Sequence, residues 1–269
     1  MKKMVFASLA LVALAGTAFA ADLPAPAYPA PVYKAPPLPP PTWSGCYVAA
    51  GGGYGLWNED TNIQVVATGA STQTITDGGR GWLGRFGGGC DYQFGVAGLG
   101  NFVVGGFGEY DVMGLSGTNV LQSAILGTVG AQIGGGSQNE SGAWYGGARI
   151  GYLVTPLLLT YFDGGYSGTR FSQVNFQTQV GGATNAMVAA NTYQGWFIGG
   201  GTEYALSFDW LPIHGLFWRN EYRFATYQTA TLPVLYSNTG AASDVAQRVS
   251  PYTQTVTTSL VWRFNWFGR

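Results

Sequence analysis

The fold is decided by the stretch Leu216-Phe-Trp-Arg-Asn-Glu-Tyr-Arg-Phe-Ala-Thr-Tyr227. Arg219, Glu221 and Arg223 occupy every second position of this stretch. The positions between them include Trp218, Tyr222 and Phe224. Because successive side chains of a β-strand point to opposite faces, the spacing predicts a strand with one ionic face and one aromatic face.

Seven further stretches alternate in the same way, and each is long enough for a tilted strand that crosses a membrane, which needs about 9–11 residues. The eight expected strands are Ser44–Trp57, Trp82–Phe94, Phe102–Met113, Ala143–Leu153, Leu157–Ser167, Tyr193–Phe208, Leu216–Tyr227 and Tyr252–Trp266. Short turns follow the second, fourth and sixth strands. Long polar loops are expected at Asn58–Gly81, Gly114–Gly142, Gly168–Thr192 and Gln228–Pro251. Short turns that alternate with long, solvated loops are typical of outer-membrane barrels.

All the charged residues within the eight expected strands fall at odd positions. They are Arg85, Asp91, Glu109, Asp111, Arg149, Asp163, Glu203, Arg219, Glu221, Arg223 and Arg263. The aromatic residues of the same stretches divide 21 to nine in favour of even positions. An Arg or Lys that faces lipid at mid-membrane costs about 2–4 kcal/mol, so the odd positions are predicted to face the lumen and the even positions lipid.

Composition separates this prediction from a water-soluble β-sandwich. Charged residues make up 9% of the chain, against roughly 25% in soluble domains, and aromatic residues make up 15%. The formal charge of −1 gives no basic excess for binding nucleic acid. The sequence therefore predicts an all-β fold, an eight-stranded antiparallel up-and-down transmembrane β-barrel.

Two segments precede the barrel, which is expected at residues 43–269. Residues 1–20 have the features of a signal peptide: Lys2 and Lys3, an apolar run too short to span a bilayer, and a small-residue cleavage site. We expect cleavage after Ala20 and export to the cell outer membrane. Residues 21–42 contain nine of the 13 prolines and are expected to form an extended periplasmic arm. This arm is either a spacer that contacts the cell wall or a disordered leader.

Several short motifs resemble a known family. They are Trp43-Ser-Gly-Cys-Tyr-Val48 with Gly53-Tyr-Gly55, Gly199-Gly-Gly-Thr-Glu-Tyr204, Asn220-Glu-Tyr-Arg223, Val261-Trp-Arg-Phe-Asn265 and Ala21-Asp-Leu-Pro24. They look like the small outer-membrane β-barrel proteins of α-proteobacteria, the porin-family surface antigens with an OmpA-type barrel. The resemblance implies an outer-membrane location, a structural or surface-exposed role and no cofactor. The chain departs from the family in its cysteines and at its C-terminus, where Gly268 and Arg269 follow Phe267.

The eleven charges expected in the lumen have two possible roles. An eight-stranded barrel has only enough interior for side chains to fill, and an unpaired buried ion costs several kcal/mol. The six acids and five arginines are therefore expected to pair into a structural ionic plug. The alternative is a narrow polar path, which would make the protein a low-conductance porin for small solutes.

Cys46 and Cys90 are expected on neighbouring strands, both with the parity of the lipid face. If the two face each other, paired residue numbers of these strands sum to 136, which is 46 plus 90. The exported compartment is oxidising, which favours a disulfide. The alternative is two reduced thiols packed as small apolar residues.

No catalytic or metal site is expected. His214, the single histidine, falls in a short turn on the opposite rim from most candidate serines. Glu109 and Asp111 could do acid–base chemistry, but they are expected to pair with arginines across the lumen. We therefore expect a non-enzymatic barrel without cofactors; a third hypothesis is an enzyme or adhesin that acts through its loops. The expected partners are outer-membrane lipid, lipopolysaccharide and the barrel-insertion machinery.

Overall fold

A computed structural model describes residues 42–121, 133–177, 184–206 and 215–264. The predicted signal peptide and nearly all of the predicted Pro-rich arm lie outside these residues, as does His214. Within the described ranges, no helix has both the length and the apolar character needed to cross a membrane.

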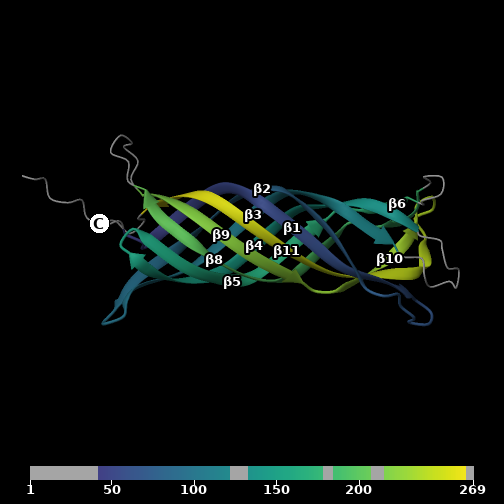
Figure 1. The fold of residues 1–269 in the computed structure, drawn as a ribbon, viewed down its shortest axis with the longest axis horizontal. Coiled ribbons are helices and arrows are strands. Elements are labelled where there is room, and N and C mark those ends of the chain that lie inside the picture. Colours follow the sequence, from purple (N-terminus) through teal and green to yellow (C-terminus); the bar gives the residue numbers. More distant parts are fainter. Residues whose placement is uncertain (1–41, 122–132, 178–183, 207–214, 265–269) are drawn as a thin grey trace, which may run out of the picture. The chain divides into compact units, whose positions relative to one another are not determined.

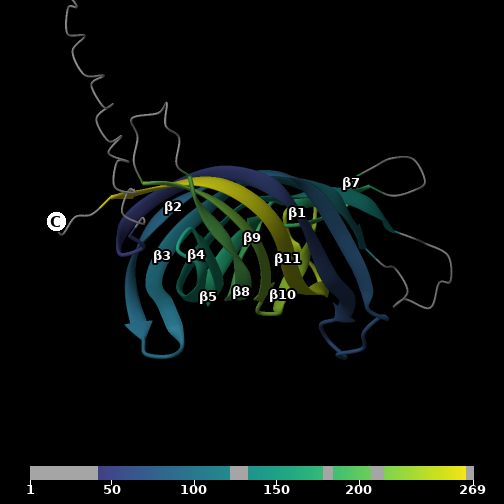
Figure 2. The same ribbon diagram turned by 60° about the vertical axis from the view of Figure 1, so that its left-hand side comes forward.

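Eight antiparallel strands close into a barrel (Figure 1). In order around the ring they are β1 (Gly45–Val65), β2 (Ile75–Val96), β3 (Gly100–Leu121), β4 (Ile133–Thr155), β5 (Leu158–Phe171), β8 (Asn191–Leu206), β9 (Leu216–Tyr227) and β11 (Ala242–Phe264). Figure 2 shows the sheet curving from β3 through β4, β5, β8 and β9 to β11. The ladder between β1 and β11 closes the ring, which satisfies the backbone groups that an edge strand would leave unpaired. The predicted eight-stranded up-and-down barrel is confirmed.

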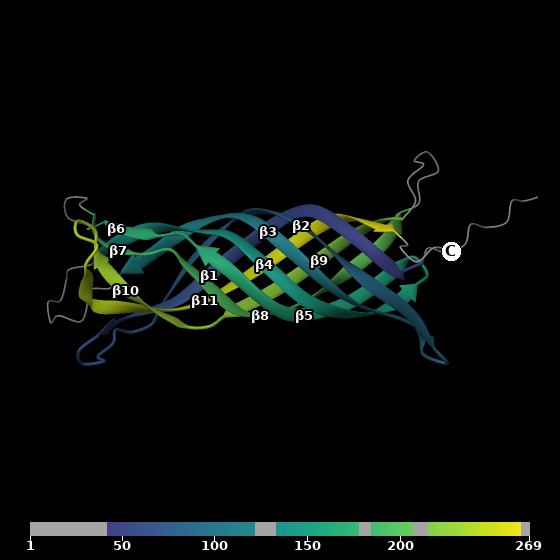
Figure 3. The ribbon, with the colours of Figure 1, turned by 180° about the vertical axis from the view of Figure 1, so that it is seen from behind.

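Three short strands continue the barrel at one end. We call the end with the start of β1 the lower end and the opposite end the upper end. β6 (Val174–Gln177) follows β5, β7 (Thr184–Val188) precedes β8, and β10 (Ala230–Tyr236) follows β9. β6 pairs with β7, β7 with β10, and β10 with β11, which repeats the order of the longer strands below (Figure 3). The upper barrel is therefore a continuation of the ring across breaks in three adjacent strands.

The strands reach further toward the upper end than the sequence predicts. β1 continues to Val65 and β2 begins at Ile75, so most of the expected loop Asn58–Gly81 is strand. The expected loops Gly114–Gly142, Gly168–Thr192 and Gln228–Pro251 are also partly or mostly strand. The prediction of four long solvated loops is therefore wrong. The alternation continues through these segments, but the outward positions become polar there, so their composition is that of a loop.

The outer wall carries a belt of exposed apolar side chains. We define this outer belt by Val48, Trp82, Phe86, Tyr110, Val112, Ile150, Phe162, Trp196, Ile198, Trp218, Val256, Leu260 and Trp262. All of these positions are even-numbered, and Trp82 and Phe162 are 75% and 73% exposed. Above the belt, β1 alternates the interior residues Glu59 and Thr61 with the outward polar residue Asp60. The outer wall therefore changes from apolar to polar toward the upper end.

The core lies inside the ring and consists of three clusters of buried apolar side chains. The lower cluster surrounds Trp43, Tyr47 and Phe217, the middle one Trp57, Tyr145 and Phe197, and the upper one Ile63, Val174 and Phe176. All nine aromatic residues at odd positions of the expected strands belong to this interior or pack against it. The lumen is thus lined by aromatic as well as charged side chains.

Candidate functional site: the ionic cluster of the barrel interior

The structure buries all eleven charged residues that the sequence assigned to the lumen. We call these eleven residues the ionic cluster. They come from seven strands of the ring, and each stands between two outward-facing neighbours in its strand. Their burial follows from the alternation of side chains along a strand, because the outer belt occupies the other face.

Glu203 of β8 accepts from three arginines in the lower half of the ionic cluster. Arg149 Nη1 lies 3.2 Å and Arg219 Nη2 3.0 Å from Glu203 Oε2. Arg263 Nη2 lies 2.6 Å from Oε1. Asp91 of β2 accepts from Arg149 and, at 2.6 Å, from Arg263 Nη1. Two carboxylates therefore balance most of the charge of three guanidinium groups from three different strands.

Arg85 and Arg223 organise the other half of the ionic cluster. Arg85 forms a bidentate pair with Asp111, with both nitrogen–oxygen distances at 2.7 Å, and donates to Glu221 at 2.6 Å. Arg223 Nη2 lies 2.6 Å from Glu221 Oε1 and 2.9 Å from Glu109 Oε2. Bidentate and charge-assisted hydrogen bonds of this kind are among the strongest in proteins.

Glu109 joins the two halves into one network. Its Oε1 accepts from Arg219 Nη1 at 3.0 Å, while its Oε2 faces Arg223. Asp163 of β5 is the remaining acid of the ionic cluster, and its Oδ2 lies 3.3 Å from Arg223 Nη2. All eleven members are thus connected through short contacts that cross the interior from one wall to the other.

Aromatic rings complete the surroundings of the arginines. The Tyr47 ring centroid lies 4.7 Å from the Cζ atoms of both Arg149 and Arg219. Arg223 Cζ lies 4.5 Å from the Tyr145 centroid and 4.7 Å from that of Phe197. A desolvated cation–π contact contributes about 2 kcal/mol or more. The sequence analysis missed these partners, although their odd positions were the signal that they share a face with the charges.

Glycine provides the room that the carboxylates occupy. A Cβ atom added at Gly105 would lie 2.0 Å from Asp91 Oδ1, and one added at Gly199 would lie 2.3 Å from Asp163 Oδ1. Both glycines are at odd, interior positions next to an acid of the neighbouring strand. Because glycine has no Cβ atom, each of these positions leaves room for the carboxylate of the neighbouring strand.

The sequence analysis did not predict three further buried acids, because it assigned them to loops. They are Glu59, Asp77 and Glu140. Glu59 and Asp77 are at odd positions, so the continued alternation was the available signal. Glu140 is at an even position, and it faces inward because the register of β4 shifts between Glu140 and Gly142.

The two cysteines lie on β1 and β2 outside the ionic cluster. The ladder between these strands pairs residues whose numbers sum to 136, including Tyr54 with Trp82 and Trp57 with Gly79. Cys46 and Cys90 are joined by a disulfide in this register. Both have even positions, so the disulfide is on the outward side of the sheet.

The acids of the ionic cluster are engaged with arginines. Glu109 and Asp111, the pair considered for acid–base chemistry, accept from Arg219 and Arg85 respectively. In the part of the chain that the structure describes, no group of three or more His, Cys, Asp or Glu side chains could hold a metal ion.

Comparison with known proteins finds similarity at the level of solved structures. No protein-family model matches the chain, and no curated protein matches its sequence. The outer-membrane protease OmpT from Escherichia coli has a TM-score of 0.41 and 10% identity, over 81% of this chain and 97% of that chain. Neisserial surface protein A has a TM-score of 0.34 and 13% identity, over 82% and 98%. The attachment invasion locus protein Ail of Yersinia pestis has a TM-score of 0.28 and 8% identity, over 81% and 99%. At these identities no residue role passes from those proteins to this chain.

Replacing Glu203 with Gln is expected to destabilise the folded barrel by about 3–5 kcal/mol, because three buried guanidinium groups lose a shared carboxylate. The exposed acid Asp244 offers a matched control, and D244N should change the free energy of unfolding by no more than about 0.5 kcal/mol. Urea unfolding of both variants in the same lipid vesicles measures the difference. Equal stability of the two variants would contradict the pairing described above.

Proposed function

We propose that this chain is a non-enzymatic outer-membrane β-barrel protein with a structural and surface-exposed role, whose lumen is plugged by the ionic cluster. The observation that carries the proposal is the sorting of side chains by face. The outer belt is apolar, and the eleven members of the ionic cluster are buried inside the ring. The resemblance of the sequence motifs to porin-family surface antigens of α-proteobacteria points to the same role.

Hydrocarbon is the environment that suits the outer belt. Trp82, Phe162 and Ile198, on β2, β5 and β8, each expose more than half of their surface. A continuous apolar surface of this kind marks contact with a membrane or a partner. The closed ladder also satisfies the backbone within the sheet, as a lipid environment requires. Together with the expected signal peptide, these features support insertion in the outer membrane.

The plugged lumen is supported by three successive layers of side chains. Trp43 of the lower cluster and Phe176 of the upper cluster are both fully buried. Between them the ionic cluster connects opposite walls through contacts of 2.6–3.3 Å. A solute on the axis would have to displace aromatic rings at both ends and separate desolvated ion pairs in the middle, at a cost of several kcal/mol for each ion left unpaired.

The alternative is a narrow porin of low conductance. Within the described residues, Tyr47 Oη and Asp163 Oδ1 are buried without a hydrogen-bond partner. Buried polar atoms of this kind commonly bind ordered water. A continuous file of such waters past the ionic cluster would provide a polar path.

Conductance in planar bilayers separates the plug from the porin. The plug predicts no steady ohmic steps from the wild-type protein. It also predicts that the double substitution E109Q and D111N lowers the free energy of unfolding, because Arg85, Arg219 and Arg223 lose acceptors. Steady steps whose size increases in the double variant, with unchanged stability, would instead establish the porin.

Substitution on the outer belt tests the membrane assignment. I198R places a guanidinium group on the apolar wall of β8 and should lower the free energy of unfolding in a bilayer by about 2–4 kcal/mol. T192R places the same group on the outward face of the same strand above the belt, where the cost should be about 0–1 kcal/mol. Equilibrium unfolding in vesicles measures both. An equal effect of the two substitutions would argue against hydrocarbon at Ile198.

A further inference from the structure

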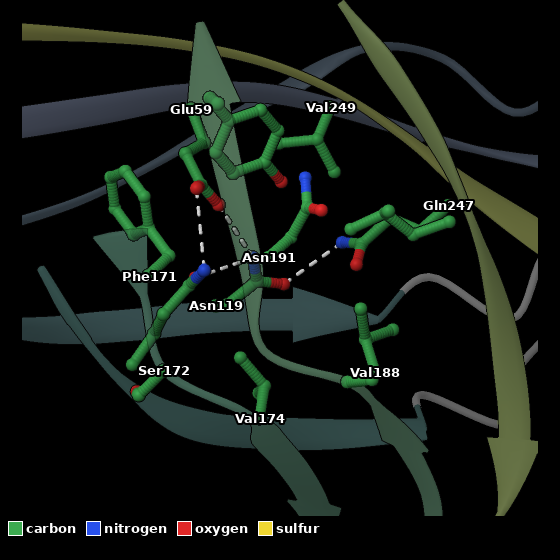
Figure 4. A pocket seen from close by; sticks show the side chains of 13 residues that line it. Glu59, Asn119, Phe171, Ser172, Val174, Val188, Asn191, Gln247 and Val249 are labelled. Carbon is green, nitrogen blue, oxygen red and sulfur yellow. Dashed lines mark hydrogen bonds between the residues drawn. The ribbon is translucent and has the colours of Figure 1, made fainter. Parts of the chain in front are cut away.

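A second polar cluster lies inside the upper barrel, above the ionic cluster. We call Glu59, Asn119, Gln138 and Gln247 the upper polar cluster; they come from β1, β3, β4 and β11. Asn119 Nδ2 donates to Glu59 Oε2 at 3.1 Å, and Gln138 Nε2 donates to Oε1 at 3.3 Å. Gln247 Nε2 donates to Asn119 Oδ1 at 2.9 Å (Figure 4). Glu59 is therefore a fully buried carboxyl group held by neutral amides.

Glu59 has no cationic partner among the described residues. The five buried arginines all belong to the ionic cluster. The titratable groups that influence Glu59 from other strands are Asp77 of β2 and Glu140 of β4, and Tyr193 of β8 faces it across the lumen. Arg80 and Arg248, on the flanking strands β2 and β11, are exposed on the outer wall. A negative charge on Glu59 would therefore meet only groups of its own sign or neutral dipoles.

A small cavity lies beside this carboxyl group. The cavity has room for about one water molecule. Its wall includes Ser172 at the break between β5 and β6 (Figure 4). The wall also includes Ala189 at the break between β7 and β8. The breaks thus leave space for a water molecule, which could exchange protons, next to a side chain that is otherwise fully enclosed.

The upper polar cluster also borders the boundary between β4 and β6, which we call the seam. No ladder connects β4 to β6 within the residues that the structure describes. The last contacts below this seam are Ser172 N to Asn139 O at 2.8 Å and Asn139 N to Ser172 Oγ at 3.0 Å. Gln138, which donates to Glu59, is the next residue of β4. The hydrogen bond from Gln138 therefore connects the edge of the seam to β1 across the lumen.

We propose that Glu59 is a proton-binding switch, whose neutral carboxyl group keeps the upper barrel closed at the seam between β4 and β6 and whose ionisation loosens that seam. The neutral acid is the form that a buried site without a cation prefers, because an unpaired charge there keeps its full desolvation cost. The inference goes beyond the proposed function, since the upper polar cluster lies outside the outer belt and the ionic cluster.

The sign of the pH dependence follows from burial. Burial raises the pKa of Glu59 from 4.5 to about 8, with Asp77 and Glu140 adding to the effect and the amide hydrogen bonds opposing it. Burial also raises the pKa of Asp77. A carboxyl group whose pKa is higher in the closed state stabilises that state fully below about pH 4.5. The contribution falls as pH rises and is lost above about pH 8, which changes the opening equilibrium on the order of a thousandfold.

Hydrogen exchange tests the switch in the full mature chain, folded in lipid nanodiscs. Protection factors, corrected for the intrinsic exchange rate at each pH, are compared between about pH 5 and pH 9. Protection of β4 near Gln138 should fall on the order of a thousandfold over this range, while protection of β9 should not change. E59Q should reduce the dependence to the smaller part that Glu140 contributes, since burial raises the pKa of Glu140 to about 7. D60N, which removes the exposed acid next to Glu59, should retain the full dependence.

A protection factor near Gln138 that is the same at both pH values would overturn the proposal, as would an unchanged dependence in E59Q. If E59Q does not fold, carboxyl-13C labelling of the five glutamates in the wild-type chain gives a second measurement. Two glutamate signals should titrate late, because burial raises the pKa of Glu140 to about 7 and that of Glu59 to about 8. The Glu59 signal should be the one that moves to higher pH in N119L, which removes a donor to its ionised form. Five glutamates that are all ionised at pH 7 would contradict the proposal.

Discussion

Pairing of arginine with carboxylate inside the ring is the interaction on which the rest of the structure depends. Arginine remains charged in any protein environment, so five guanidinium groups in a narrow interior need acceptors from other strands. Arg149 joins β4 to Asp91 of β2, and Arg85 joins β2 to Glu221 of β9. These contacts fix which walls face each other. They also leave the outer face free to be apolar.

The two ends of the barrel interior are stabilised differently. In the ionic cluster each carboxylate meets at least one guanidinium group, and aromatic rings such as Tyr47 cover the remaining faces of the arginines. In the upper polar cluster Glu59 meets only amides. The first arrangement gives every carboxylate a cationic partner, whereas the second leaves its acid without one. The lower barrel is thus suited to a rigid role and the upper barrel to a response.

Alternation alone predicts the ring, the buried face and the bounds of β9, because all three follow from the period of two along a strand. It does not predict the upper barrel, since Asp60 and its outward neighbours have the composition of a loop. The inward position of Glu140 depends on a local register shift, which has no signature in the spacing. The contact between Arg219 and Glu109 joins residues 110 apart in the chain, so parity can assign both to one face but cannot pair them.

The most direct test of the sorting by face is the environment of spin labels on the outer wall. Labels at Phe86, Ile150 and Ile198, on three different strands, should collide with oxygen dissolved in the bilayer and be shielded from a water-soluble nickel complex. Labels at Asp60 and Thr192, above the outer belt, should show the reverse. Equal access of the nickel complex to both sets would mean that the outer belt is not in hydrocarbon. That result would contradict the sorting of apolar side chains to the lipid face and of charged side chains to the interior.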